Sequence, residues 1–399
     1  MARKTEVQSK LEKLLGERSG QKSRKKVIYG LYDNSAESMY VRINDFLIDH
    51  SRVPLKEKAY FFHLLAVMID AGIPVMQAID ILASKSKNER FVRILDTIAY
   101  NLRQGVPLSK AMSRFPDVFG EMELGVIKSG EAAGNLDKML FKLASELDKS
   151  NELQIKLVTA SVYPVMVLLI LVLAAAGMLT FVIPSLMDLL LEGGLSEEEL
   201  PLMTKILVGA SDFMVAWWWL LVVMGFVIYF SFNFWINTED GRYAWDVFKL
   251  RIPVIGELLR KVYTLRFVST LGILLESGLP VVKSLEIVAI SMNSDTYSLK
   301  AWEVINRVKN GEKISDSLAD TPFLFSDTIS QMIGIGEKTA SISLISEKIS
   351  EHYDTEINHS LKRLTSLFEP LMIIIVGIFV ALLALAILMP VFQLSQVVS

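Results

Sequence analysis

The stretch YPVMVLLILVLAAAGMLTFVIP, residues 163–184, decides the fold class because it contains no charged side chain. A helix of about 20 mostly apolar residues is long enough to cross the hydrocarbon core of a bilayer. Two more charge-free stretches of similar length lie at 213–236 and after Glu369. Each is expected to be a helix, because a segment in lipid must satisfy its own backbone hydrogen bonds. The sequence therefore predicts three transmembrane helices.

The charges beside these stretches predict how the chain is oriented in the membrane. The loop expected between the first two spans, residues 188–212, has six acidic residues and a single basic residue, Lys205. Basic residues collect on the cytoplasmic side of membrane proteins. We therefore expect an external loop, a cytoplasmic N-terminus and an external C-terminus. The other flanks carry the basic residues Lys149, Lys156, Arg242, Lys249, Arg251, Lys362 and Arg363.

The chain also contains an internal repeat with a constant offset of 206 residues. No gap is needed to align the two copies, and the repeated unit is a cytoplasmic domain followed by one span. The span at 213–236 has no counterpart and returns the chain to the cytoplasm. The aligned pairs are AGIPV (71–75) with SGLPV (277–281), QGVPLSKAM (104–112) with NGEKISDSL (310–318), and SGEAAG (129–134) with IGEKTA (335–340).

Glycine and proline divide each repeat into helical segments, because glycine often ends a helix and proline often begins one. The expected fold class is an all-α membrane protein with two homologous cytoplasmic helical bundles, of about six helices each, and three transmembrane helices. The residues that mark the shared helix breaks are Gly72, Pro74, Gly130 and Glu131 in the first copy, and Gly278, Pro280, Gly336 and Glu337 in the second.

The same patterns predict the limits of each part of the chain. Residues 1–26 hold nine basic and three acidic residues, which indicates either a solvated tail or contact with anionic lipid or an acidic protein face. The expected parts are a basic, partly flexible N-terminal segment (1–50), domain 1 (52–158), transmembrane helix 1 (159–187), an acidic external loop (188–212), transmembrane helix 2 (213–237), domain 2 (238–366) and transmembrane helix 3 (367–393).

The stretch IGIGEKTAS, residues 333–341, looks like a phosphate-binding loop. Such a loop needs a Gly-Lys pair before Ser or Thr, so that backbone amides and the lysine converge on phosphate. Here Glu337 precedes Lys338, and the residue equivalent to Lys338 in the first copy is Ala132. What the two copies share is the Gly-Glu pair. We therefore expect a helix break that carries one glutamate, and no nucleotide site.

The composition gives no sign of an enzyme or of a nucleic-acid-binding protein. The chain has no cysteine, its four histidines lack the spacing of metal ligands, and its net charge is −3. No His-Glu-x-x-His or Gly-x-Ser-x-Gly motif occurs. We therefore expect no catalytic residue, no bound cofactor and no nucleic-acid partner.

We also consider the hypothesis that the first copy contains one weak metal-binding site. The carboxylate of Glu131, at a helix break, is expected near the amide oxygens of Gln77 and Asn135, and such oxygens suit a hard cation such as Ca²⁺. The second copy has Lys283 and Ser341 in place of the two amides, so only the first copy would bind. The alternative is a helix junction held by hydrogen bonds without metal.

Several motifs together resemble a known family. LKEKAYFFHLLAVMIDAGIPVMQAI, QGVPLSKAM, FPDVF, SGEAAGNLDKML and YPVM occur in this order, and related segments follow in the second copy. This arrangement resembles the inner-membrane platform proteins of type IV pilus and type II secretion machines, over about residues 52–399. Residues 1–50 depart from the family pattern. Some members with a cytoplasmic metal site are similar to this chain around Gln77, Glu131 and Asn135.

The resemblance implies a non-enzymatic hub in the bacterial inner membrane. Such a protein binds a separate cytoplasmic assembly ATPase, forms homo-oligomers, contacts other inner-membrane assembly proteins, and couples the ATPase to insertion or extraction of pilin subunits. The main expectation is a type IV pilus, and the alternative is a type II secretion system that assembles pseudopilins. A transporter would need more spans, and a receptor would need a larger external domain.

The points where the domains enter the membrane suggest a mechanism. Tyr163-Pro164 and Glu369-Pro370 occupy equivalent places at the start of the first and third spans. Proline weakens a helix locally. One hypothesis is that these sites transmit domain motion to the spans. The alternative is that the prolines only begin the spans.

Overall fold

The computed structural model describes residues 28–29, 45, 47–49, 51–192 and 202–397. These residues form helices and no strand, which confirms the predicted all-α class. The chain divides into two compact units, residues 1–149 and 150–399, and each is described by itself. Most of the predicted N-terminal segment 1–50 lies outside the described residues, as does part of the predicted external loop.

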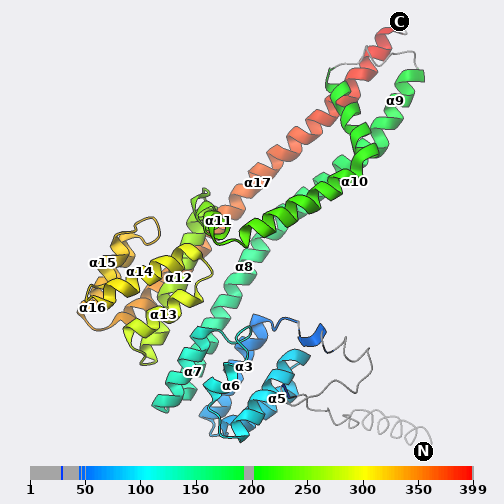
Figure 1. Ribbon diagram of the computed structural model, residues 1–399. Coiled ribbons are helices and arrows are strands. Elements are labelled where there is room, and N and C mark those ends of the chain that lie inside the picture. Colours follow the sequence, from blue (N-terminus) through cyan, green and yellow to red (C-terminus); the bar gives the residue numbers. More distant parts are fainter. Residues whose placement is uncertain (1–27, 30–44, 46, 50, 193–201, 398–399) are drawn as a thin grey trace, which may run out of the picture. The chain divides into compact units, whose positions relative to one another are not determined.

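The first unit is a helical bundle around an aromatic core (Figure 1). Phe61 lies edge-on to Phe91, with ring centroids 5.3 Å apart, and Phe62 lies edge-on to Phe119 at 6.0 Å. All four rings are buried, and each such aromatic pair contributes about 0.5–1.5 kcal/mol beyond its buried area. The helices are α3 (Leu55–Asp70), α4 (Val75–Lys85), α5 (Glu89–Arg103), α6 (Leu108–Met112), α7 (Glu121–Ala133) and the start of α8 (Leu136–Gly177).

The second unit contains a bundle with the same helix order and the same core positions. Phe267 lies edge-on to Phe325 at 5.1 Å, and Tyr297 lies edge-on to Phe325 at 5.3 Å. Subtracting 206 from these three numbers gives Phe61, Phe119 and Phe91 of the first core. The helices are α11 (Glu239–Arg251), α12 (Ile255–Glu276), α13 (Val281–Ser291), α14 (Asp295–Lys309), α15 (Ile314–Ala319), α16 (Asp327–Lys338) and α17 (Ile342–Val397).

The first helix break of each copy needs glycine. Gly72 and Gly278 have φ values of +81° and +90°, a region that residues with a Cβ atom rarely adopt. Each ends its helix, and the proline two residues later, Pro74 or Pro280, directly precedes the next helix. The chain therefore turns in the same way at both positions.

Three helices are long and apolar enough to cross a membrane, as predicted. They are Leu136–Asp188, Thr204–Ile236 within α10 (Leu202–Ile236), and Ile342–Leu385 within α17. The first and third continue from the bundles into the apolar stretches without a break. The predicted limits between domains and spans stay predictions. Those at 158/159 and 366/367 lie within α8 and α17, where no change in secondary structure marks them.

The first span contains a feature that was not predicted, a π-helical turn at Met178–Val182 (η1), followed by α9 (Ile183–Glu192). In π geometry each N–H bonds to the carbonyl five residues earlier. Pro184 has no N–H, so the carbonyl of Leu179 lacks its helical donor. The hydroxyl of Ser211 in α10 donates to that carbonyl at 2.5 Å. A polar side chain of the second span therefore supplies the hydrogen bond that this carbonyl of the first span lacks.

Candidate functional site: paired glutamate clasps and the helices they position

Glu131, in the last turn of α7, binds the beginning of α6. Its carboxylate accepts hydrogen bonds from the backbone N–H of Leu108 at 2.6 Å and of Ser109 at 3.2 Å, and from the Ser109 hydroxyl at 2.5 Å. The first N–H groups of a helix have no partner within the helix, and the partial positive charge there favours a carboxylate. Glu131 therefore joins the end of one helix to the start of another.

Glu337 makes the same contacts in the second copy. It accepts from the N–H of Ile314 at 2.6 Å, the N–H of Ser315 at 3.1 Å and the Ser315 hydroxyl at 2.6 Å. Every donor and acceptor is offset by 206 from its counterpart. We call the two sites the glutamate clasps: Glu131 with Leu108 and Ser109, and Glu337 with Ile314 and Ser315.

The glycine before each glutamate allows the next helix to pack closely. A Cβ atom on Gly130 would lie 3.1 Å from the Cβ of Met139 in α8. A Cβ atom on Gly336 would lie 3.0 Å from the Cα of Ile342 in α17. Both distances are shorter than normal contacts between such atoms. The Gly-Glu pair thus combines close helix packing with capping of a third helix.

The stretch 333–341 that resembled a phosphate loop is the end of α16 and the turn after it. Lys338 is the last residue of that helix, and the N–H of Ser341 donates to the carbonyl of Gly336 at 2.8 Å. Ala340 has a φ of +51°, where the first copy has Gly134 with a φ of +68°. The segment therefore has the geometry of a helix end, with Glu337 directed to the start of α15.

The three predicted metal ligands, Gln77, Glu131 and Asn135, differ in exposure and in hydrogen bonding. Gln77 is exposed on α4, and the carboxylate of Glu131 belongs to the first clasp. Asn135 follows α7, and its Oδ1 atom is buried without a hydrogen-bond partner. Within the described residues, no group of three or more His, Cys, Asp or Glu side chains could hold a metal ion. Any site here would rest on amide oxygens and one carboxylate.

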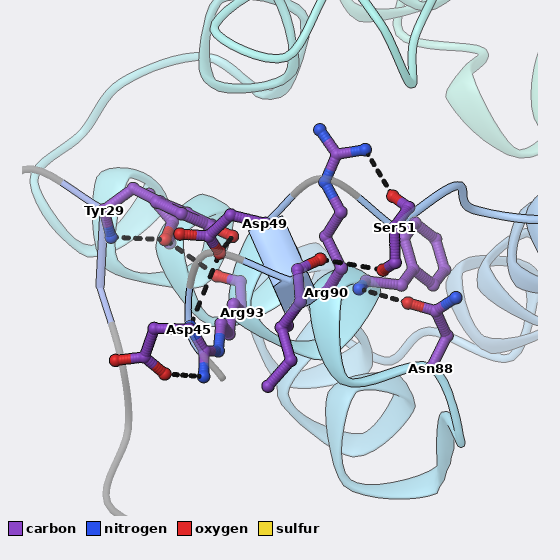
Figure 2. Close-up of polar contacts among 10 residues, drawn as sticks. Tyr29, Asp45, Asp49, Ser51, Asn88, Arg90 and Arg93 are labelled. Atoms are coloured by element: carbon purple, nitrogen blue, oxygen red, sulfur yellow. Dashed lines mark hydrogen bonds and ion pairs between the residues drawn. The ribbon is translucent and has the colours of Figure 1, made fainter. Parts of the chain in front are cut away.

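Each bundle is also joined to an element that precedes it in the chain. In the first unit, Arg93 of α5 pairs with Asp45 at 2.5 Å and with Asp49 at 3.4 Å (Figure 2). The hydroxyl of Tyr29 donates to Asp49 at 2.5 Å, and its backbone N–H donates to Thr97 in α5 at 3.0 Å. Burial, and then the bond to Asp49, raise the pKa of Tyr29 above its ordinary value. The described residues before α3 are therefore held against α5.

In the second unit α11 packs against α14, the equivalent of α5. Asp246 of α11 accepts from the Ser294 hydroxyl at 2.6 Å, the Thr296 N–H at 3.1 Å and the Thr296 hydroxyl at 2.8 Å. Burial alone would raise the pKa of Asp246, but these hydrogen bonds outweigh it and lower the pKa. Neither junction was predicted from the sequence, because the residues that form each junction are far apart in the chain.

A polar pair of the first copy, Lys58 and Glu123, is replaced by two uncharged residues in the second. Lys58 pairs with Glu123 at 2.5 Å and also donates to the carbonyl of Val118 at 2.9 Å. In the second copy Thr264 replaces the lysine and donates to the equivalent carbonyl of Leu324 at 3.2 Å, while an isoleucine, Ile329, replaces the glutamate. This difference could have been predicted from the repeat alignment, because two charged residues of the first copy align with two uncharged residues of the second.

The helices that enter the membrane meet just before the spans begin. Leu153 and Leu157 of α8 pack against a cluster that contains Ile357 and Leu361 of α17 and Leu258 of α12. The predicted span-entry residues follow within α8 and α17, where Pro164 is buried, while Tyr163, Glu369 and Pro370 are exposed. A displacement of either helix would therefore act on the other close to the membrane.

A duplicated helical bundle with three apolar helices defines a membrane protein built from a tandem repeat. The sequence profile of the family "Type II secretion system (T2SS), protein F" matches the chain twice, at residues 61–184 and 267–390. The start and end of the two matches are each 206 residues apart, which confirms the predicted repeat. This chain belongs to that family.

Curated relatives carry two kinds of name. The chain is 32% identical to the type IV pilus assembly protein PilC of Thermus thermophilus, over 86% of this chain and 84% of the relative. It is 31% identical to a protein of the same name from Myxococcus xanthus, over 86% and 82%. It is 30% identical to the type II secretion system protein F of Pseudomonas aeruginosa, over 84% and 82%.

Proposed function

We propose that this chain is the platform protein of a type IV pilus machine in the bacterial inner membrane. It couples a separate cytoplasmic assembly ATPase to insertion and extraction of pilin subunits and has no catalytic activity of its own. The observation that carries the proposal is the family profile, which matches both halves of the chain. The names of two relatives favour a pilus over a secretion machine.

The arrangement of helices supports a mechanical role. In each copy the Gly-Glu pair holds three helices together, namely α6, α7 and α8 in the first copy and α15, α16 and α17 in the second. Helices α8 and α17 then continue into apolar stretches. A helix transmits displacement along its axis because its backbone hydrogen bonds resist stretching. Movement of a bundle driven by the ATPase would thus reach the spans.

The orientation of the chain in the membrane, as proposed here, follows from the distribution of basic and acidic residues beside the spans. The N-terminus and both bundles are cytoplasmic, where they meet the ATPase, and the C-terminus is periplasmic. Homo-oligomers, other inner-membrane assembly proteins and the pilin subunits are the further partners. The alternative is a platform protein of a type II secretion system, supported by the name of the Pseudomonas aeruginosa relative.

A clean deletion of the gene separates the two functions. Surface pili are counted by electron microscopy, and exported proteins are measured in the same cultures. We expect loss of pili with normal export, restored by the gene in trans. Loss of export with normal pili would assign the chain to secretion instead. No change in either, in a strain without a second copy of the gene, would contradict the platform function.

We also propose that the first copy binds Ca²⁺ weakly at Gln77, Glu131 and Asn135. The unpartnered Oδ1 atom of Asn135 supports this site. A carboxylate offers about four acceptor positions, of which the first clasp uses three. Ca²⁺ binding to the purified protein is measured by equilibrium dialysis, with Asn135→Ala as the test variant and Ser341→Ala as the control. Binding that is equal in wild type and Asn135→Ala would contradict the site.

A further inference from the structure

Helix α11 begins directly after the second span and is fixed to its end (Figure 1). Only Asn237 and Thr238 separate it from α10. The Thr238 hydroxyl accepts from the N–H of Gly241 at 3.1 Å and donates to the carbonyl of Trp235 at 2.6 Å. A Cβ atom on Gly241 would overlap that same carbonyl. The first turn of α11 therefore lies against the last turn of α10.

An aromatic stripe continues from the span onto α11. Trp245 lies edge-on to Phe232 of α10, with ring centroids 5.1 Å apart and an interplanar angle of 87°. Phe248 stacks on Trp245 at 5.5 Å and 22°. Phe232 precedes the end of α10 at Ile236 by four residues, or about 6 Å at 1.5 Å per residue. The Trp245 ring therefore lies beside the apolar part of the span.

Among the residues that the structure describes, none covers either end of this stripe. The exposed fraction of Phe248 is 56%, and that of Phe232 is 42%. Arg251 is exposed one turn beyond Phe248, and its long side chain could reach the polar headgroups. Aromatic residues with basic neighbours are typical of helices that lie at a membrane–water interface.

Contacts of the opposite face of α11 with the bundle fix the rotation of this helix about its axis. Asp246 is only 3% exposed and holds α11 to Ser294 and Thr296, and Leu250 is fully buried. The side chain of Arg260 in α12 donates to the carbonyl of Leu250 at 2.6 Å. Because these contacts hold the opposite face of α11 against the bundle, the aromatic face is directed away from it.

We infer that α11 lies in the interfacial region of the phospholipid bilayer, with Trp245 and Phe248 at the level of the headgroups. The occupant of the exposed face is lipid rather than protein because the stripe is continuous with a surface of the span that faces hydrocarbon. α11 thereby sets the height of the second bundle above the membrane. This inference requires only that α10 spans the membrane, and it holds for a pilus or a secretion machine.

The absence of cysteine makes a direct test simple, because each single-cysteine variant has one thiol. A nitroxide label is placed at Phe248→Cys, and the protein is reconstituted in phosphatidylcholine liposomes. Electron paramagnetic resonance then compares collisions with oxygen, which concentrates in lipid, and with a water-soluble nickel chelate. Leu344→Cys is the matched control, since Leu344 is 55% exposed but precedes Glu369 by 25 residues, roughly 37 Å along α17.

We expect the label at residue 248 to collide more with oxygen than with the chelate, and the label at residue 344 to show the reverse. A label at 248 that is as accessible to the chelate as the control would overturn the inference. So would a label at 248 that is immobile and inaccessible to both reagents, because that result indicates a protein contact. Each variant is used only if it retains the helical circular dichroism of the wild type. If Phe248→Cys fails this check, Ala244→Cys, one turn earlier and also exposed, replaces it with the same expected result.

Discussion

Glu337 makes in the second copy the same three hydrogen bonds that Glu131 makes in the first. In both cases the donors are two backbone N–H groups at the start of a short helix and one serine hydroxyl. α6 has 5 residues and α15 has 6, so neither is long enough to be stable alone. The carboxylate supplies contacts that such short helices cannot supply themselves. The repeat thus preserves a complete junction, including its hydrogen-bond partners.

Loss of a clasp should destabilise its bundle. Replacing Glu337 with Ala leaves two N–H groups and a hydroxyl without their acceptor, at a cost of about 1–3 kcal/mol. We expect the Tm of the full-length protein in detergent, followed by circular dichroism, to fall by roughly 2–6 °C. Glu347→Ala removes an exposed carboxylate of α17 and serves as the control. Equal Tm values for the two variants would show that the clasp does not stabilise the fold.

The buried pair Lys58–Glu123 gives a test by exchange between the copies. Lys58→Thr alone leaves Glu123 buried without its cation, which costs about 3–5 kcal/mol. The double variant Lys58→Thr/Glu123→Ile carries the residues of the second copy, and we expect most of that loss to be recovered. The three variants, with Glu123→Ile alone, form a double-mutant cycle measured by chemical unfolding. Additive effects of the two substitutions would contradict a direct interaction between the side chains.

Asp246 should make the second unit sensitive to acid. Its pKa is lowered in the folded protein, so the stability it contributes is complete above the ordinary pKa of an aspartate, near 4. That contribution is lost as the pH falls through the lowered pKa of the folded state. We expect Asp246→Asn to lower the Tm at pH 7 and to have a smaller effect at pH 3. A Tm difference that is the same at both pH values would argue against this role of the charge.

The prolines at the span entries test the mechanical proposal. Pro164→Ala and Pro370→Ala each restore a backbone N–H and should stiffen α8 and α17. If these points must bend during the working cycle, the double variant will lose surface pili while its protein level stays normal. Immunoblotting controls the level, and electron microscopy counts the pili. Full piliation would mean that the prolines only mark the beginnings of the spans.

The sequence predicted the helical class, three apolar helices and the duplication because these depend on composition and spacing along the chain. It also singled out Glu131 and Glu337, but not their partners. A backbone N–H such as that of Leu108 carries no sequence signal, since nearly every residue has one. The π-helical turn was missed because it depends on Pro184 and on Ser211 from another helix. Lys58 and Glu123 are 65 residues apart, and only packing brings them together.

The two bundles share their helix order and core, yet they belong to one polypeptide. In a symmetric dimer of separate chains, every substitution would appear in both halves. Here Lys58 and Glu123 exist in one half only, and Thr264 and Ile329 take their places in the other. Each half can therefore acquire its own surface and its own stability. A tandem duplication therefore lets one gene supply two bundles of the same fold with different surfaces.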